Sequence, residues 1–472
     1  MPRFRLRGGL LASAIFATAP LVAAQKVITQ EELDELEKSD SRLTDVPLPL
    51  QYDLVPPRPQ PVLEIGNPYQ GTGRFEENLF LGTGAVFQPS LLVWGTYRTA
   101  FNVALDERGA RDVTEWANRL DIFGEYRLSG TERAVIGFRP LDKEGNFLGY
   151  DFENSSSNQE FNGNVRTLFF EGDFGELFPE LDREERNAHD YGFSFGRQPI
   201  FFQNGVMIND ILDAVGVTRN SKRFWGFSNA RFTALAAVND IHRGTGAEDT
   251  DATLLAFLTE VDTKDSTVEL DVALGLSNDG SDGTYVGYGS TQRIGHYNTT
   301  FRANVSVDMD DVGSAFVDDG LLLSAEISKT LHHSDDLVYL NTFLGIDSYR
   351  SAAQDPASAG PLAATGILFA GTGIGTAGAP LGGLADDSLA AAVGLQKFMN
   401  GGRAQLTGEL GGRYNYDAER GALAVAGRWQ KAWGQHTVFR VDLYAGFDDA
   451  GGITGGFDGA FAGTRLEMLV KF

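Results

Sequence analysis

Residues 464–472, the last nine of the chain, alternate strictly between two kinds of side chain. Leu466, Met468, Val470 and Phe472 fall on one face, and Arg465, Glu467 and Lys471 fall on the other. In an extended strand, successive side chains point to opposite faces, so this segment has one apolar face and one charged face. A membrane-spanning β-barrel can close on such a strand, and a soluble sheet can end in one. The rest of the chain distinguishes these two structures.

The first 24 residues predict a secretory signal peptide. Arg3, Arg5 and Arg7 form a basic region, residues 10–21 are apolar, and residues 22–24 are the small residues of a cleavage site. The apolar stretch is too short for a stable transmembrane helix. We therefore expect the mature chain beyond the inner membrane of a bacterium.

Composition restricts the class of fold and of partner. The chain has no cysteine, so neither disulfides nor thiolate chemistry are available. After the signal, no apolar stretch is long enough for a transmembrane helix, so a membrane form must use strands. The formal charge is −25, and loss of the three signal arginines would make it −28. This excludes a general nucleic-acid binder and predicts acidic loops and an acidic lumen.

Residues 25–75 differ in character from the remainder. Residues 29–32 form a capping box that predicts a short acidic helix to about Lys38. Six prolines between positions 47 and 61 then predict an extended linker, and plain disorder is the alternative. We expect three parts: a signal peptide at 1–24, a periplasmic lead-in at 25–75 and a barrel at 76–472.

Alternating segments recur along the barrel region. Clear cases are residues 119–128, 267–277, 297–308 and 437–447. Each is about ten residues long, which suffices for a tilted strand to cross a bilayer. Short turns alternate with long connections at 140–163, 198–222, 309–319 and 349–387, as in outer-membrane barrels, although the charged segment 176–189 breaks the rule. The sequence predicts an all-β fold, a single transmembrane antiparallel barrel of about 18 strands, with 16 as the alternative.

Part of the chain resembles the alginate export channels of the outer membrane. The aromatic and acidic segment 169–175, the segment 191–198 with its Gly196-Arg197-Gln198 tripeptide, and the hairpin expected from 223–227 and 231–239 carry the resemblance. It covers about 80 residues and implies an outer-membrane barrel with a transport role. The acidic composition, in contrast, does not favour a polyanion as the solute.

The connection at 199–222 is the candidate pore constriction. It is rich in apolar residues, which are costly in water, so we expect it to fold into the barrel mouth. Docking on the rim or between protomers is the alternative. The candidate constriction residues are Arg197, Asn209, Asp210, Asp213 and Arg219.

Strand parity also predicts which charged side chains face the lumen. Rings of fixed charge set selectivity in wide pores, although these residues could equally be ordinary paired wall residues. The candidates are Asp121, Glu125, Arg127, Glu171, Asp173, Glu269, Asp271, Arg302, Arg413, Arg440 and Glu467.

Metal sites and catalysis have weak support. The turn at 278–283 and several aspartate pairs are rich in oxygen ligands, but they lack the spacing of a calcium loop, and a solvated turn explains them. The sequence contains no phosphate loop, no metalloprotease helix motif and no nucleophile elbow. We predict neither an enzyme nor a cofactor or metal site.

These observations predict an outer-membrane channel for passive passage of ions, small polar solutes or a polysaccharide. The charge predicts a preference for cations. The alternative is a non-transporting surface barrel, an adhesin or structural protein whose long loops, especially 350–385, bind a partner. The expected partners are outer-membrane lipid, lipopolysaccharide and, through the strand ending in Phe472, the barrel-assembly machinery.

Overall fold

A computed structural model gives the structure of the chain. It describes residues 60–66, 79–106, 112–143, 145–184, 189–223, 226–278, 281–310, 316–358, 360–371, 373–449 and 459–472. Within these ranges, no helix has both the length and the apolar character needed to cross a lipid bilayer. The predicted signal peptide and the predicted acidic helix lie outside the described residues, and both stay predictions.

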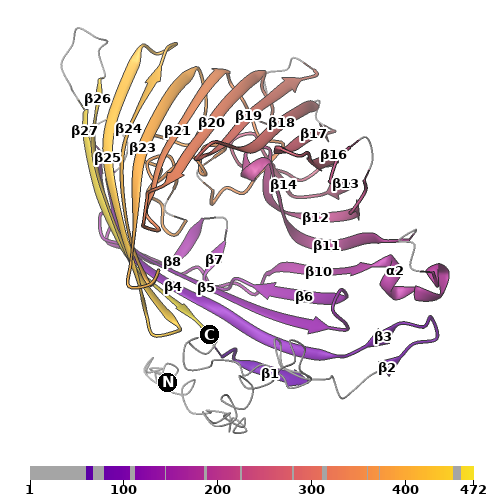
Figure 1. Ribbon diagram of the computed structural model, residues 1–472. Helices are drawn as coiled ribbons and strands as arrows, with labels where there is room; N and C mark the ends of the chain where they lie inside the picture. Colours follow the sequence, from indigo (N-terminus) through magenta and orange to yellow (C-terminus); the bar gives the residue numbers. More distant parts are fainter. Residues whose placement is uncertain are drawn as a thin grey trace, which may run out of the picture. The chain divides into compact units, whose positions relative to one another are not determined.

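Eighteen long strands form a closed antiparallel barrel, which confirms the predicted fold and strand number. The first nine are β4 (Ser90–Asp106), β5 (Val113–Arg127), β6 (Arg133–Phe138), β10 (Val165–Asp173), β11 (Tyr191–Phe202), β12 (Ile208–Arg219), β13 (Asn229–Val238), β16 (Thr253–Asp262) and β17 (Ser266–Leu276). The other nine are β18 (Gly283–Ile294), β19 (Tyr297–Asp308), β20 (Gly320–Thr330), β21 (Leu337–Asp347), β23 (Ser388–Met399), β24 (Ala404–Asn415), β25 (Arg420–Trp433), β26 (Thr437–Asp449) and β27 (Gly459–Lys471). Each pairs with the next in this order, and β27 pairs with β4, so indigo and yellow ribbons lie side by side in Figure 1.

The two faces of each strand differ as the alternation predicts. On β24, Leu406 and Leu410 are 45% and 58% exposed, whereas Thr407 and Glu409 between them are 4% and 2% exposed. The apolar residues point out of the barrel and the polar ones point inward. An apolar exterior with a polar interior is the pattern that a bilayer demands of a β-barrel.

Connections of different length lie at the two ends of the barrel. One end, here called the turn end, has tight turns such as 263–265 and 434–436 and carries Phe472, whose backbone exchanges hydrogen bonds with Gly95. The described part of the charged segment 176–189 also lies there; it contains the end of α2 (Phe174–Leu177) and all of η1 (Pro179–Asp182). The opposite end, here called the loop end, carries the longer connections.

Small strands add to both ends. At the turn end, β1 (Leu63–Gly66) extends β4, and β2 (Leu79–Phe80) pairs with β3 (Val86–Phe87). The β6–β10 connection contains β7 (Asp142–Lys143), β8 (Asn146–Asp151) and β9 (Ser156–Asn158), and the β13–β16 connection contains β14 (Ile241–Arg243) and β15 (Ala247–Asp249). The predicted lead-in at 25–75 therefore contributes one strand, β1, among its described residues.

Candidate channel constriction

The segment 199–222 is mostly strand, so the prediction of a long loop there is wrong. Phe202 at the end of β11 pairs with Ile208 at the start of β12, and only five residues, including η2 (Gln203–Gly205), join them. The hairpin strand predicted at 223–227 is absent from the described part of that segment, because β12 lies earlier in the chain. The predicted strand number is still correct, because β12 takes the place of the strand predicted at 223–227.

The tip of this β11–β12 hairpin bends into the lumen, as the apolar composition predicted. Gln203 Nε2 donates a hydrogen bond to Asp271 Oδ2 on β17 at 2.7 Å, so the tip passes over the inner faces of β13 and β16. Met207, Ile208 and Leu212, all at most 1% exposed, pack in one cluster with inner-face residues of β13, β16, β17 and β18. The apolar tip is thus covered by the wall on one side.

The β21–β23 connection, residues 348–387, covers the tip on its other side. Val206 O accepts hydrogen bonds from the hydroxyls of Tyr349 at 3.1 Å and Ser351 at 2.7 Å. Within this connection, β22 (Ala353–Gln354) pairs in parallel with the first two residues of β12. We call residues 348–387 the lumen loop, because its apolar side chains are buried inside the barrel: Leu362, Leu368, Phe369 and Ile374 are at most 1% exposed.

Two predicted constriction residues hold these lumenal elements together. Asp210 is 3% exposed and accepts from the backbone nitrogen of His242 at 3.1 Å, and its carboxylate also contacts the His242 ring. Burial lowers the pKa of His242, but the hydrogen bond and the charge of Asp210 outweigh it, so the net shift is upward. Asn209 O accepts from the backbone nitrogen of Asp355 in the lumen loop at 2.7 Å. Asp210 therefore holds the hairpin tip through its side chain, whereas Asn209 contributes through its backbone, and a role of the Asn209 side chain stays a prediction.

The other three predicted constriction residues lie elsewhere. Arg197 and Asp213 pair with each other in register on the face that also carries Phe195 and Val215, which are 50% and 57% exposed. That face points out of the barrel. Arg219 pairs with Tyr191 at the turn end of the hairpin, far along the strand from its tip. The prediction that Arg197, Asp213 and Arg219 line the constriction is wrong. It assumed a loop at 199–222 followed by a strand at 223–227, whereas β12 occupies residues 208–219 and turns these side chains elsewhere.

The predicted lumen-facing residues occupy inward positions, where most form ion pairs. Examples are Asp121 with Arg139 at 2.6 Å and Arg302 with Glu326 at 2.6 Å. Others with close polar partners inside the barrel are Glu125, Arg127, Glu171, Asp271, Arg413, Arg440 and Glu467. Glu269 lies beside Arg302 and Asp271, while Asp173 caps α2 by accepting from Gly175 N at 2.8 Å. Most of these side chains thus support the wall by pairing within it.

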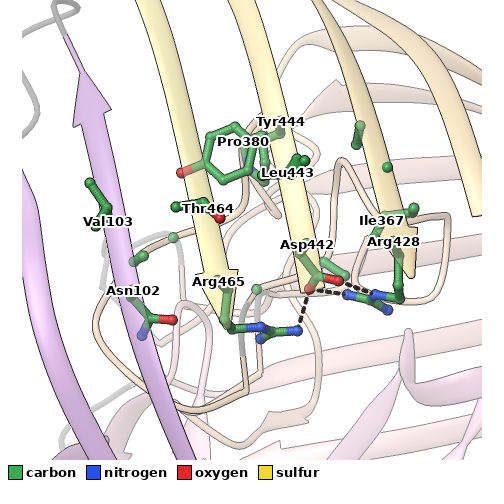
Figure 2. A pocket seen from close by; sticks show the side chains of 16 residues that line it. Asn102, Val103, Ile367, Pro380, Arg428, Asp442, Leu443, Tyr444, Thr464 and Arg465 are labelled. Carbon is green, nitrogen blue, oxygen red and sulfur yellow. Dashed lines mark hydrogen bonds and ion pairs between the residues drawn. The ribbon is translucent and has the colours of Figure 1, made fainter. Parts of the chain in front are cut away.

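Four arginines and two carboxylates form a continuous network on adjacent strands. Asp442 on β26 is contacted by Arg428 of β25 and Arg465 of β27, and Figure 2 shows both guanidinium groups directed at it. Glu467 is contacted by Arg98 at 2.7 Å, Arg465 at 3.5 Å and Arg440 at 3.7 Å. We call these six residues the arginine cluster. Its formal charge is positive, which contradicts the expected acidic lumen in this sector.

A polar cavity of about 570 Å³ lies between the lumen loop and the turn end of the wall. Arg428 and Arg440 line it, and their side chains are 26% and 30% exposed. Its other wall residues are mainly amides and hydroxyls, among them Asn298, Thr300, Gln396, Gln405 and Gln430. A second cavity, of about 500 Å³, lies on the side of the loop end and is lined largely by glycine and alanine of the lumen loop. The lumen loop separates the two.

The residues that hold the lumen loop were missed by sequence reasoning. Glu409 and Glu115, 2% and 9% exposed, accept hydrogen bonds from its backbone nitrogens, and Asn102 donates to its Ile374 O at 3.1 Å. One sequence signal could have located the part of the wall that the hairpin tip covers. The run 254–258 on β16 is apolar on both faces, as expected of a strand buried on both sides.

The described residues contain no group of three or more metal-ligating side chains placed to hold an ion. No protein-family model matches the sequence, and no curated protein matches it significantly.

The structure is similar to several solved outer-membrane proteins. OccK2 (OpdF) of Pseudomonas aeruginosa superposes with a TM-score of 0.54 at 10% identity, over 81% of this chain and 97% of that one. OccAB3 of Acinetobacter baumannii gives 0.51 at 11%, over 81% and 99%. The outer membrane protein OpdK of Pseudomonas aeruginosa gives 0.51 at 13%, over 81% and 98%, and it has also been solved with vanillate. The chain has the 18-strand barrel fold of these outer-membrane porins.

Proposed function

We propose that this protein is a passive channel of a bacterial outer membrane for small polar solutes. The observation that carries the proposal is a closed barrel, apolar outside and polar inside, whose lumen is narrowed by the lumen loop and the hairpin tip. A barrel without exposed strand edges satisfies its backbone in lipid, and a polar lumen offers a hydrated path. The similar folds of OccK2 and OpdK support the proposal.

The arginine cluster favours organic anions among these solutes. Arg440 contacts Glu467 only at 3.7 Å and lines the polar cavity, so its charge faces the solute path. The surrounding amides can hydrogen-bond a polar solute that passes the cluster. Vanillate, the compound in an OpdK structure, is itself a carboxylate. We therefore replace the cation preference expected from net charge by a preference for small carboxylates.

The resemblance to alginate exporters finds no support in the comparisons, because the similar structures are Occ and Opd outer-membrane proteins. Residues 169–173 lie in β10 and residues 191–198 in β11, so these segments are strands as the resemblance implied, but the lumen loop fills part of the lumen that a polymer would have to cross. The adhesin alternative depended on residues 350–385 as an external binding loop. The lumen loop includes that segment and has a largely buried interior, so it offers little free surface to a partner.

Planar-bilayer recording in a salt gradient tests the proposed function. We expect stable conductance steps and a reversal potential that indicates anion preference. Replacing Arg440 with Gln removes one charge from the path, worth about 0.7 kcal/mol at ~6 Å in water, so the permeability ratio should shift about three-fold toward cations. Arg197→Gln is the matched control, because Arg197 lies on the outer face. Absence of conductance would contradict the channel, and a cation-selective wild type would contradict the role of the arginine cluster.

A further inference from the structure

Apolar side chains of the lumen loop pack against the wall, whereas the hydrogen bonds between the wall and the middle part of the loop use mainly the loop backbone. Its middle part is rich in Gly and Ala, which offer no long side chains for anchoring. Backbone N–H and C=O groups inside a barrel must still find partners. The wall supplies them at a few places, and two of these are glutamates on distant strands.

The first anchor is Glu409 on β24. Its Oε1 accepts a hydrogen bond from Leu368 N at 2.9 Å, and its Oε2 accepts from Ile367 N at 3.1 Å and from the Tyr339 hydroxyl at 2.6 Å. Gly366, with φ of +143°, precedes these amides, and a Cβ there would lie 2.5 Å from Oε2. Only a glycine lets the loop approach this carboxylate so closely.

The second anchor is Glu115 on β5, and it repeats the arrangement. Its Oε1 accepts from Thr376 N at 2.7 Å, and its Oε2 accepts from Thr376 Oγ1 at 3.0 Å. The Asn102 side chain donates to the same Oε1 at 2.9 Å. Gly375, with φ of +100°, precedes this amide, and a Cβ there would lie 2.3 Å from Oε1. Both anchors therefore combine a buried wall carboxylate, loop amides and an adjacent glycine.

The span between the anchors crosses the arginine cluster. Strands β25, β26, β27 and β4 separate β24 from β5 in the barrel order. The loop must pass in front of these strands between Ile367 and Thr376, and only a narrow space remains behind it. Figure 2 shows that space, which Ile367 and Pro380 of the loop line together with Arg428, Asp442 and Arg465 of the wall. The position of this span sets the width of the path beside the arginines.

We propose that Glu409 and Glu115 are positioning residues that fix the channel aperture by holding the lumen loop across the arginine cluster. The proposal rests on the proposed function. A carboxylate accepts hydrogen bonds from several amides at once, and such charge-assisted bonds are the strong ones. Glutamine at 409 loses the charge and turns one acceptor oxygen into a donor that faces a backbone N–H group of the loop. Glutamine at 115 keeps an acceptor for Thr376 N and Asn102 but loses the charge that strengthens both hydrogen bonds. Each substitution therefore weakens its anchor and lets the loop move away from the wall.

Conductance measures the aperture. We expect Glu409→Gln and Glu115→Gln each to raise single-channel conductance by roughly two-fold, with more frequent current fluctuations, and the double variant to raise it further. Glu132→Gln is the matched control. Glu132 is 1% exposed and also accepts from backbone, Asp173 N at 3.2 Å, but it lies in the β5–β6 turn away from the lumen loop. Unchanged conductance in the double variant would overturn the proposal.

Thiol labelling gives a readout that does not depend on conduction. The chain has no cysteine, so Ala426→Cys places a single thiol on the wall behind the loop, where Ala426 is 7% exposed. We expect slow reaction with a charged thiol reagent in the parent and reaction roughly ten-fold faster with either glutamine substitution. Faster labelling of the glutamine variants without any conductance would support the anchoring role of the two glutamates and contradict the proposed channel function. Equal labelling rates in the parent and the glutamine variants would contradict the anchoring role.

A second variant covers the case in which a glutamine substitution prevents folding. Gly375→Ala leaves both carboxylates in place and adds only a methyl group that the Glu115 anchor cannot accommodate. We expect Gly375→Ala to raise the conductance and the labelling rate as Glu115→Gln does. Glu409→Asp keeps a carboxylate, so its conductance and labelling rate should lie between those of the parent and those of Glu409→Gln. Parent-like values for Gly375→Ala would contradict the proposal.

Discussion

Two neighbouring residues of β14 illustrate how buried ionic side chains hold the loops at the barrel mouth. Arg243 is 1% exposed and donates to Asp249 Oδ2 at 2.9 Å and to Ser281 O at 2.5 Å. His242 contacts Asp210 of the hairpin tip. The contact with Asp249 lies within the β14–β15 hairpin, whereas the contacts with Ser281 and Asp210 join this hairpin to other parts of the barrel mouth. Removing one partner of such a pair leaves a buried charge without compensation.

Replacing Arg243 with Met should open the β14–β15 hairpin locally. The cost is about 3–5 kcal/mol, because Asp249 would remain buried without its cation. Faster hydrogen exchange of the amides in residues 241–249, with unchanged exchange in β24, is the expected result. The double variant Arg243→Met with Asp249→Leu should cost less than the single one. A double variant as destabilised as the single would show that the pair itself is not responsible.

The contact between His242 and Asp210 should depend on pH. The charges that face His242 are Asp210 of β12, Asp355 of the lumen loop and Glu248 of β15, and together they raise its pKa above the ordinary 6.5 despite the opposing effect of burial. A raised pKa means that the stabilisation is fully present below pH 6.5 and is lost as pH rises through the folded-state pKa. Hydrogen exchange in residues 239–252 should therefore accelerate, beyond its intrinsic pH dependence, as that pKa is passed. His242→Gln should abolish this additional acceleration of hydrogen exchange. If the additional acceleration persisted in the variant, His242 would not be its source.

At the scale of elements, the β11–β12 hairpin and the lumen loop have different roles although both lie inside the barrel. The hairpin tip continues two wall strands and packs between the wall and the lumen loop. The lumen loop contributes only the short β22 to the sheet and is fixed by side chains of the wall. We infer that the hairpin is needed for folding and that the lumen loop is needed for selectivity.

Two deletions should separate these roles. Deleting residues 203–216 removes most of β12 and breaks its pairing with β11 and β13, so we expect no folded barrel. Deleting residues 361–380 leaves every barrel strand intact, so we expect a folded barrel with larger conductance. Heat-modifiable migration in gel electrophoresis reports the folded state. A folded product of the first deletion would contradict the role given to the hairpin.

At the scale of the whole molecule, the fold depends on closure between the first and last barrel strands. Strand β27 pairs with β4 over eleven positions from Phe461 to Lys471, and the backbone of Phe472 continues the contact at Gly95. A Cβ at Gly95 would lie 2.5 Å from Asp121 O and 2.8 Å from the Phe472 ring. Recognition of the terminal strand by the assembly machinery stays a prediction.

A Gly95→Val substitution should therefore slow or prevent closure. The added side chain clashes with both the β5 backbone and the terminal ring, whereas the same change at Gly408, where no atom would lie within 4 Å of an added Cβ, should be tolerated. Folding yield in detergent, followed by heat-modifiable migration, measures the effect. Equal yields for the two variants would show that closure tolerates a side chain at Gly95.

The class of fold, the approximate strand number and the inward or outward direction of most wall residues could be predicted from sequence patterns alone. These features follow from a local rule, since period-two alternation and turn spacing are written in neighbouring residues. The sequence also indicated that the apolar segment near residue 207 folds inward, although it placed β12 wrongly because a strand buried on one face by the lumen loop does not alternate like a lipid-facing one. Which long connection fills the lumen, and which residues hold it there, became evident only from the folded barrel. Glu115 and Thr376 are 261 positions apart, and a carboxylate that binds backbone amides needs no particular partner side chain, so no sequence pattern marks the pair. The arginine cluster is partly local, because five of its residues lie on the consecutive strands β25, β26 and β27, and barrel closure adds Arg98 of β4. Its positive charge could not be read from the net charge of the chain, which is dominated by acids elsewhere.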